Sequence, residues 1–257
     1  MPQFERYIGI DYSGAETPTS SLKGLRVYQA GIGESAREVP PPPSPRKYWT
    51  RHGIAMWLAE QLTTDVPTIV GIDHGFSFPV SYFEAHGLPQ NWDAFLEDFV
   101  AHWPTHENIS VESVRNGLAG QGTLRQGSAR WRRLCEMRAR AKSVFHFDVQ
   151  GSVAKSTHAG IPWLLSLRRH VRKLHFWPFD GWRVLPGQSV VLEAYPALYK
   201  SNYVSEDRTP DQHDAFSISS WLRDADADGR LQEALQPNFA PDLLVQARIE
   251  GWILGVM

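Results

Sequence analysis

The chain has 257 residues with a hydrophobic content of 42%, enough to bury the core of one large domain or of one domain with an insertion. Its formal net charge of -2 excludes a globally basic nucleic-acid coat but not a local basic patch. A single cysteine, Cys135, excludes an intramolecular disulfide and a multi-thiolate metal site. No apolar stretch approaches the roughly 20 residues that cross a bilayer, and nothing before Phe4 resembles an export signal, so we expect a cytoplasmic protein.

The first part of the chain predicts a β-meander, a helix and a buried strand. Residues 7–10 and 25–29 have the patterns of strands, and the prolines at 40–43 end a third strand. Thr50 is the expected N-cap of a helix over residues 51–62. Residues 68–72 are almost continuously apolar and β-branched, as in strands covered on both faces.

The second part predicts a helical insertion over residues 80–178, then a third buried strand. That strand, residues 189–194, ends in Glu193 and is stopped by Pro196. Thr209-Pro-Asp-Gln forms a capping box with proline at the first helical position, which predicts a helix through about residue 223. A further helix is expected from Pro241 to about residue 249.

Acidic residues end the predicted central strands. The tripeptide Gly-Ile-Asp closes two apolar runs, at Asp11 and at Asp73, and Glu193 closes the third. Ligands of α/β sheets bind outside the carboxyl ends of the strands, so these acids are expected at one site. Asp214 falls in the second turn of the capped helix, on its apolar face, where a carboxylate needs a partner or a metal ion.

Four such carboxylates suit hard divalent cations, and two ions about 3.5–4 Å apart can clamp the oxygens of a phosphoryl displacement. We therefore predict Mg²⁺ or Mn²⁺ ligands, with one or two ions bound. Taken singly, a strand-terminal aspartate also commonly caps the next turn, which is the structural alternative for each.

The order of these motifs resembles the ribonuclease H-like fold, and specifically a bacterial domain-of-unknown-function family of predicted ribonuclease H-like nucleases. The resemblance covers nearly the whole chain and includes "EAYP", "DQHDAFSISSWL", "GSVAKSTHAGIPWL" and "EGWILGV". It implies a five-stranded mixed sheet flanked by helices, with a largely helical insertion between the fourth and fifth strands. It also implies Asp11, Asp73, Glu193 and Asp214 as catalytic metal ligands. The glutamate that ribonucleases H carry on the first helix has no clear match, and Glu60 is not assigned that role.

Two further segments are candidates for contact with substrate. Residues 151–157 lack the glycine that a phosphate-binding P-loop requires before its lysine, yet Lys155, Ser152 and Ser156 are candidates for phosphate contact, with a simple turn as the alternative. The basic stretch from Arg125 to Lys142 suits a nucleic-acid backbone, and a solvated helix face is an equally good interpretation.

The sequence is consistent with three functions. The first is a metal-dependent nuclease, and nucleic acid is then the expected partner. The second is an ATP-binding phosphotransferase with a sugar-kinase or actin-like core, because both Gly-Ile-Asp turns also resemble phosphate-binding turns; one sheet's worth of strands argues against it. The third is a binding or scaffold protein whose acids no longer catalyse a reaction.

Overall fold

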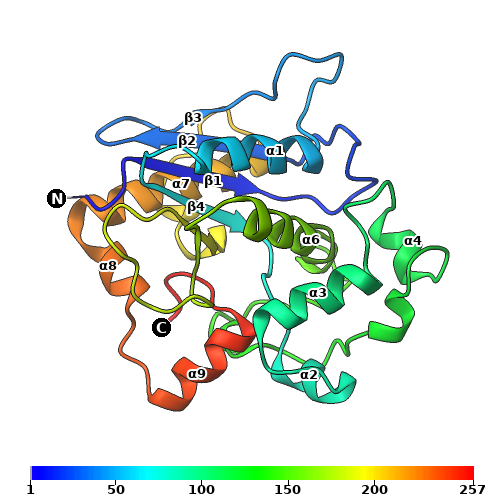
Figure 1. Ribbon diagram of the computed structural model, residues 1–257. Helices are drawn as coiled ribbons and strands as arrows, with labels where there is room; N and C mark the ends of the chain where they lie inside the picture. Colours follow the sequence, from blue (N-terminus) through cyan, green and yellow to red (C-terminus); the bar gives the residue numbers. More distant parts are fainter. Residues whose placement is uncertain (1) are drawn as a thin grey trace.

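The computed structural model describes residues 2–257, which form a six-stranded mixed sheet flanked by helices (Figure 1). The strand order is β3-β2-β1-β4-β6-β5. Strand β1 is antiparallel to β2 and parallel to β4, and β6 is parallel to both β4 and β5. The strands are β1 (Arg6–Asp11), β2 (Arg26–Gly31), β3 (Arg37–Glu38), β4 (Thr68–Asp73), β5 (His175–Phe176) and β6 (Val190–Glu193).

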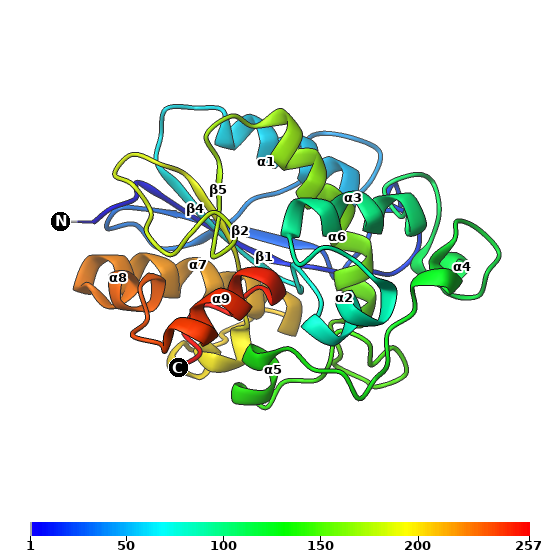
Figure 2. The same ribbon diagram turned by 60° about the horizontal axis from the view of Figure 1, so that its bottom comes forward.

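Helices cover both faces of the sheet. The α-helices are α1 (Arg51–Leu62), α2 (Val80–His86), α3 (Trp92–His102), α4 (Val111–Arg115), α5 (Leu134–Arg138), α6 (Ala154–His170), α7 (Pro210–Asp228), α8 (Arg230–Leu235) and α9 (Pro241–Glu250). Short 3₁₀ turns are η1 (Gly122–Arg125), η2 (Pro196–Leu198) and η3 (Lys200–Asn202). Figure 2 shows α1 on one side of the strands and α7, α8 and α9 on the other.

The alternation of side chains along each strand divides the core into two layers. Ile8 and Ile10 of β1 pack with α1, α3 and α6 in one hydrophobic cluster. Tyr7 of the same strand packs with Ile218 and Leu222 of α7 in the other. The central strands are therefore buried on both faces, as their continuous apolar sequences predict.

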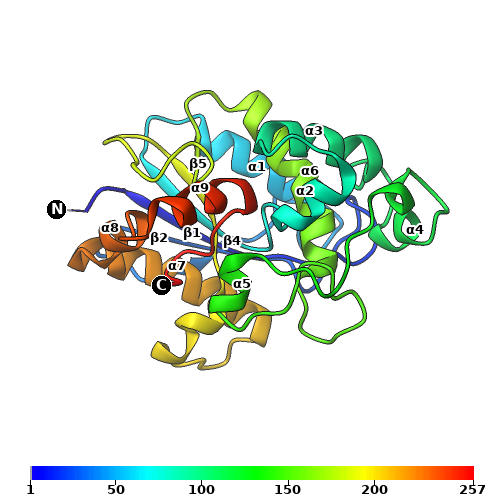
Figure 3. The same ribbon diagram turned by 90° about the horizontal axis from the view of Figure 1, so that it is seen from below.

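Helices α2, α5 and α9 come together beside the carboxyl ends of the central strands (Figure 3). The chain then returns to the sheet after α9. Ile253 makes a parallel bridge with Glu193, and the Leu254 amide donates to the Glu193 carbonyl at 3.0 Å. Segments from residues 73–80, 130–144, 193 and 250–254 consequently meet at one place.

Most predicted elements are present, and two expectations about the sheet are corrected. The predicted five strands are six, because His175 and Phe176 add a parallel edge strand that is too short to leave a sequence pattern. The region predicted as a helical insertion therefore contains a strand of the sheet, and its helix α6 packs in the core against the sheet. No helix within residues 2–257 combines the length and the apolar character needed to span a membrane.

Candidate metal centre

The two Gly-Ile-Asp tripeptides lie side by side. Strands β1 and β4 are parallel and aligned without offset, so that Gly9 pairs with Gly71, Ile10 with Ile72 and Asp11 with Asp73. Each tripeptide ends its strand. The repeated sequence thus delivers two neighbouring carboxylates to the carboxyl edge of the sheet, as predicted from the strand ends.

Helix α7 supplies the third carboxylate, Asp214. Its first turn is fixed by the predicted capping box: the Gln212 amide donates to the Thr209 hydroxyl at 3.3 Å, and the Thr209 amide donates to the Gln212 side chain at 3.0 Å. The helix then lies directly on β1 at Gly9. A Cβ atom there would stand 2.2 Å from the Ala215 carbonyl oxygen, so only glycine permits this approach. Gly9 thus allows α7 to pack closely on β1, and Asp11 of the same tripeptide contributes a carboxylate to the site.

Asp11, Asp73 and Asp214 each offer a carboxylate oxygen, and these atoms lie within 4.8 Å of one another. All three side chains are partly exposed. Burial raises the pKa of Asp73 to about 8, and repulsion from Asp214 and Glu193 adds to this effect. Burial and repulsion from Asp73 also raise the pKa of Asp11 well above its usual value. A fully ionised trio would therefore carry more negative charge than its surroundings neutralise, so the site favours uptake of a proton or a cation.

Lys200 is the cation nearest to the trio. Its Nζ lies 2.9 Å from Oδ1 and 3.3 Å from Oδ2 of Asp214. The charge of Lys200 also lowers the pKa of Asp73 and of Asp11, although less than burial and the other carboxylates raise it. One ammonium would offset only one charge of the fully ionised trio. No sequence motif marks Lys200, which lies seven residues after Glu193 at the start of the 3₁₀ turn η3.

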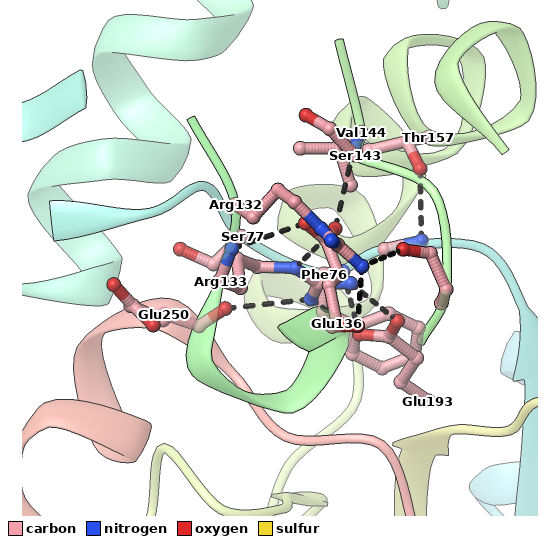
Figure 4. Close-up of polar contacts among 12 residues, drawn as sticks. Phe76, Ser77, Arg132, Arg133, Glu136, Ser143, Val144, Thr157, Glu193 and Glu250 are labelled. Atoms are coloured by element: carbon pink, nitrogen blue, oxygen red, sulfur yellow. Dashed lines mark hydrogen bonds and ion pairs between the residues drawn. The ribbon is translucent and has the colours of Figure 1, made fainter. Parts of the chain in front are cut away.

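Glu193, the fourth predicted ligand, lies outside this trio. Its two carboxylate oxygens accept hydrogen bonds of 2.6 Å each from the two terminal nitrogens of Arg133 (Figure 4). The Phe76 amide also points at Glu193 Oε2, at 3.4 Å. Glu193 is 4% exposed. The structure thus brings together three of the four predicted carboxylates, and an arginine binds the fourth.

Arg133 belongs to a buried polar network that joins four segments of the chain. Its Nε donates to Glu136 Oε1 at 2.9 Å, and Glu136 also accepts from the Val144 amide at 3.2 Å. Glu250 accepts from the amides of Val80 and Leu134, each at 2.8 Å. Arg133 belongs to the basic stretch from Arg125 to Lys142, for which the sequence suggests either contact with nucleic acid or a solvated helix face. Neither interpretation describes this residue, because Arg133 is buried and its guanidinium binds two carboxylates, that of Glu136 three residues away and that of Glu193 60 residues away.

The remaining cations of the basic stretch differ in their surroundings. Arg125 pairs with Asp98 at 2.9 Å, and Arg132 donates to the carbonyls of Glu136 and Ala141. The exposed members are Arg130, Arg138, Arg140 and Lys142. Lys142 also lines a narrow cavity together with Asp73, Arg133, Glu193 and Tyr195. Of the trio only Asp73 lines this cavity, whose other walls include Arg133, Glu136 and Glu193 of the buried network.

The predicted phosphate contacts at the start of α6 are engaged within the chain. Lys155 Nζ lies 3.1 Å from Glu112 Oε2. The Ser156 hydroxyl donates to the Val153 carbonyl at 2.9 Å, and the Ser152 hydroxyl accepts from the Ala154 amide at 3.1 Å. The same turn packs on the loop after Asp11: a Cβ atom on Gly14 would lie 2.1 Å from the Lys155 carbonyl. Ser152, Lys155 and Ser156 therefore stabilise the start of α6, and the trio does not include them.

No protein-family model, curated protein or solved structure matches this chain. Three carboxylates at the ends of two parallel strands and on an adjoining helix form a set of hard oxygen donors, and hard divalent cations prefer such donors.

Proposed function

We propose that this protein is a Mg²⁺- or Mn²⁺-dependent phosphodiesterase that acts on nucleic acid, with a ribonuclease H-like fold. The observation that carries the proposal is the approach of Asp11, Asp73 and Asp214 within 4.8 Å of one another at the carboxyl edge of a mixed sheet. The raised pKa of Asp73 supports it, because a divalent cation would relieve the repulsion that causes part of this shift.

The donor set fits one divalent ion better than the two ions that the sequence allows. Three carboxylates are available, and one of them already contacts Lys200. Glu193, which would complete a second coordination shell, is neutralised by Arg133. We therefore expect one tightly bound ion, with any second ion depending on oxygens from the substrate.

The chain contributes a rigid arrangement of ligands to this reaction. Sheet register fixes Asp11 beside Asp73, and the close contact between Gly9 and α7 fixes Asp214 across from them. A bound divalent ion lowers the pKa of a coordinated water and stabilises negative charge on a phosphoryl group. Because the ligands are held by backbone contacts, little reorganisation is needed when substrate binds.

Exposed cations of the basic stretch support a nucleic-acid substrate, and one of them, Lys142, lines the same narrow cavity as Asp73. Arg138, at the end of α5, is exposed, and its guanidinium lies 5.0 Å from the ring centre of Phe239 and 5.6 Å from that of Trp252. Arg140 and Lys142 follow in the next loop and are exposed. Such groups bind a phosphate backbone through release of its counterions, so cleavage should weaken as salt concentration rises.

The test begins with calorimetric titration of Mn²⁺, which requires no choice of substrate. The wild type should bind one equivalent, and Asp11→Asn, Asp73→Asn and Asp214→Asn should each lower the affinity by about tenfold or more, because each removes a charged ligand. Asp65→Asn is the matched control, since Asp65 is an exposed aspartate that precedes β4 at the other end of the strand. Its affinity should equal that of the wild type.

Cleavage assays follow, with RNA, DNA and hybrid oligonucleotides in Mg²⁺ or Mn²⁺. Cleavage that survives in Asp11→Asn would contradict the assignment. Cation binding without cleavage of any of these substrates would favour a binding protein over an enzyme. Tight ATP binding would favour the phosphotransferase alternative, although both of its phosphate-binding turns lie on adjacent strands of one sheet.

A further inference from the structure

Lys200 forms an ion pair inside the candidate metal centre. Its Nζ contacts both oxygens of Asp214, at 2.9 and 3.3 Å. Within residues 2–257, Nζ donates no other hydrogen bond. The lysine therefore contacts both oxygens of the Asp214 carboxylate, and a divalent cation that takes Asp214 as a ligand meets the positive charge of Lys200 at the same group.

The backbone of Lys200 is fixed, whereas its side chain reaches the trio from solvent. The Lys200 carbonyl accepts from the Tyr203 amide at 3.2 Å and lies 3.2 Å from Nε2 of His213 on α7. The Lys200 side chain is 43% exposed. A lysine has a flexible four-carbon stem, so its ammonium can leave Asp214 while the backbone stays in place.

Charge favours such an exchange. Without a divalent cation, Lys200 offsets part of the negative charge of the trio. A divalent cation among three carboxylates neutralises more charge than the ammonium does, and two cations that share Asp214 repel each other. The displaced ammonium would lie at the edge of the site, where it can meet the anionic group of a substrate.

We propose that Lys200 is an exchangeable counter-ion. Its ammonium pairs with Asp214 until a divalent cation displaces it, and it then binds a phosphate oxygen of the substrate. This inference rests on the proposed function, because it requires a cation at the trio. Lys200 should then have two measurable effects: it weakens the binding of the metal ion and strengthens the binding of phosphate.

The experiment measures Mn²⁺ affinity by calorimetry in the full chain and in Lys200→Gln. The variant should bind Mn²⁺ about tenfold more tightly, because a competing charge is removed. Lys155→Gln is the matched control: Lys155 is also a partly exposed lysine paired with a single carboxylate, that of Glu112, but it is not part of the trio. Its Mn²⁺ affinity should stay within twofold of the wild type, on the order expected for exposed pairs.

The second measurement titrates inorganic phosphate into the Mn²⁺-loaded proteins. Phosphate should bind at least about fivefold more weakly to Lys200→Gln than to the wild type, since a charged hydrogen bond is lost. Lys200→Arg keeps the positive charge and should stay close to the wild type in both titrations. Thermal melting of each metal-free variant checks that the fold is intact.

The possible outcomes separate this inference from the function on which it rests. Tighter Mn²⁺ binding together with weaker phosphate binding in Lys200→Gln supports the exchange. Unchanged Mn²⁺ affinity, or unchanged phosphate affinity, overturns the exchange and leaves the metal centre standing. Failure of the wild type itself to bind Mn²⁺ overturns the proposed function and the inference with it.

Discussion

Arg133 binds the carboxylate of Glu193 through two hydrogen bonds of 2.6 Å, and both side chains are almost completely buried. The same guanidinium donates to Glu136, which is also buried. Arg133 is therefore the cation that makes two buried carboxylates tolerable beside the candidate metal centre. Because the network joins α5, β6 and the segment after α9, it also determines how the wall of the site is built.

Replacement of Arg133 by methionine should lower the free energy of unfolding by about 3–5 kcal/mol, because it leaves buried carboxylates without a cation. The double variant Arg133→Met with Glu193→Leu removes the charge pair and should recover part of this loss. Urea unfolding of the metal-free proteins measures both quantities. A loss below about 1 kcal/mol in the single variant would show that the pair does not stabilise the fold.

Glu193→Gln tests whether Glu193 is a metal ligand or only the ion-pair partner of Arg133. If Arg133 keeps this carboxylate out of the coordination shell, the variant should bind Mn²⁺ within about threefold of the wild type, whereas Asp73→Asn should lose about tenfold or more. Calorimetric titration of the three proteins decides the matter. A loss in Glu193→Gln as large as that in Asp73→Asn would return Glu193 to the set of metal ligands.

Helix α7 packs closely on the sheet at Gly9, and an alanine there should push α7, with Asp214, away from β1. Its Cβ would lie 2.2 Å from the Ala215 carbonyl oxygen and 2.6 Å from the Ser219 nitrogen, both backbone atoms of α7. We expect Gly9→Ala to lower the free energy of unfolding by at least about 2 kcal/mol and to weaken Mn²⁺ binding, because α7 carries Asp214.

Gly24→Ala is the control for this prediction. No atom lies closer than 3.7 Å to a Cβ at that position, so the substitution adds a methyl group without a clash. Urea unfolding and Mn²⁺ titration should give values near those of the wild type. Equal behaviour of Gly9→Ala and Gly24→Ala would mean that α7 can move away from β1 at little cost.

The elements that build the trio could be predicted because their signals are local. Helix α1 has the bounds that its Thr50 cap and apolar spacing predict, and α7 begins with the predicted Thr209 capping box. Asp11 and Asp73 follow apolar runs whose ends show where the strands stop. Strand ends, caps and turns lie within a few residues of the side chains that define them, so one sequence suffices to find them.

The partners of the charged groups could not be predicted, because they depend on long-range contacts. Arg133 and Glu193 are 60 residues apart in sequence, and α5, which follows Arg133, has only five residues. Lys200 contacts Asp214 because η3 turns back toward α7, and no periodic pattern reports such a turn. Sequence patterns therefore located the carboxylates, whereas only the structure shows which cations neutralise them.

His158 provides a test of the core that does not depend on the metal centre. It lies on α6, is 1% exposed, and packs against the rings of Trp103 at 4.5 Å and Phe147 at 4.7 Å. Burial lowers the pKa of His158 to about 3, and the charge of Arg115 acts in the same direction. The folded protein therefore keeps this imidazole neutral over the pH range in which the unfolded chain protonates it.

The sign of the effect follows from this difference. Below an unfolded pKa of about 6.5 the unfolded state binds a proton that folded His158 does not bind, so stability falls as pH falls toward about 3. Between pH 6.5 and pH 4 this one group should remove about 3 kcal/mol. His74, whose pKa is lowered to about 4 mainly by burial, adds a similar slope over most of that range.

His158→Phe should therefore flatten the dependence of stability on pH between 6.5 and 4, whatever its effect at pH 7. Urea unfolding at several pH values, with the metal removed by a chelator, gives this slope for the variant and the wild type. The comparison uses the difference in slope, so a constant packing cost of the phenylalanine cancels. Parallel curves for the two proteins would show that His158 is protonated in the folded core, against the burial that the structure shows.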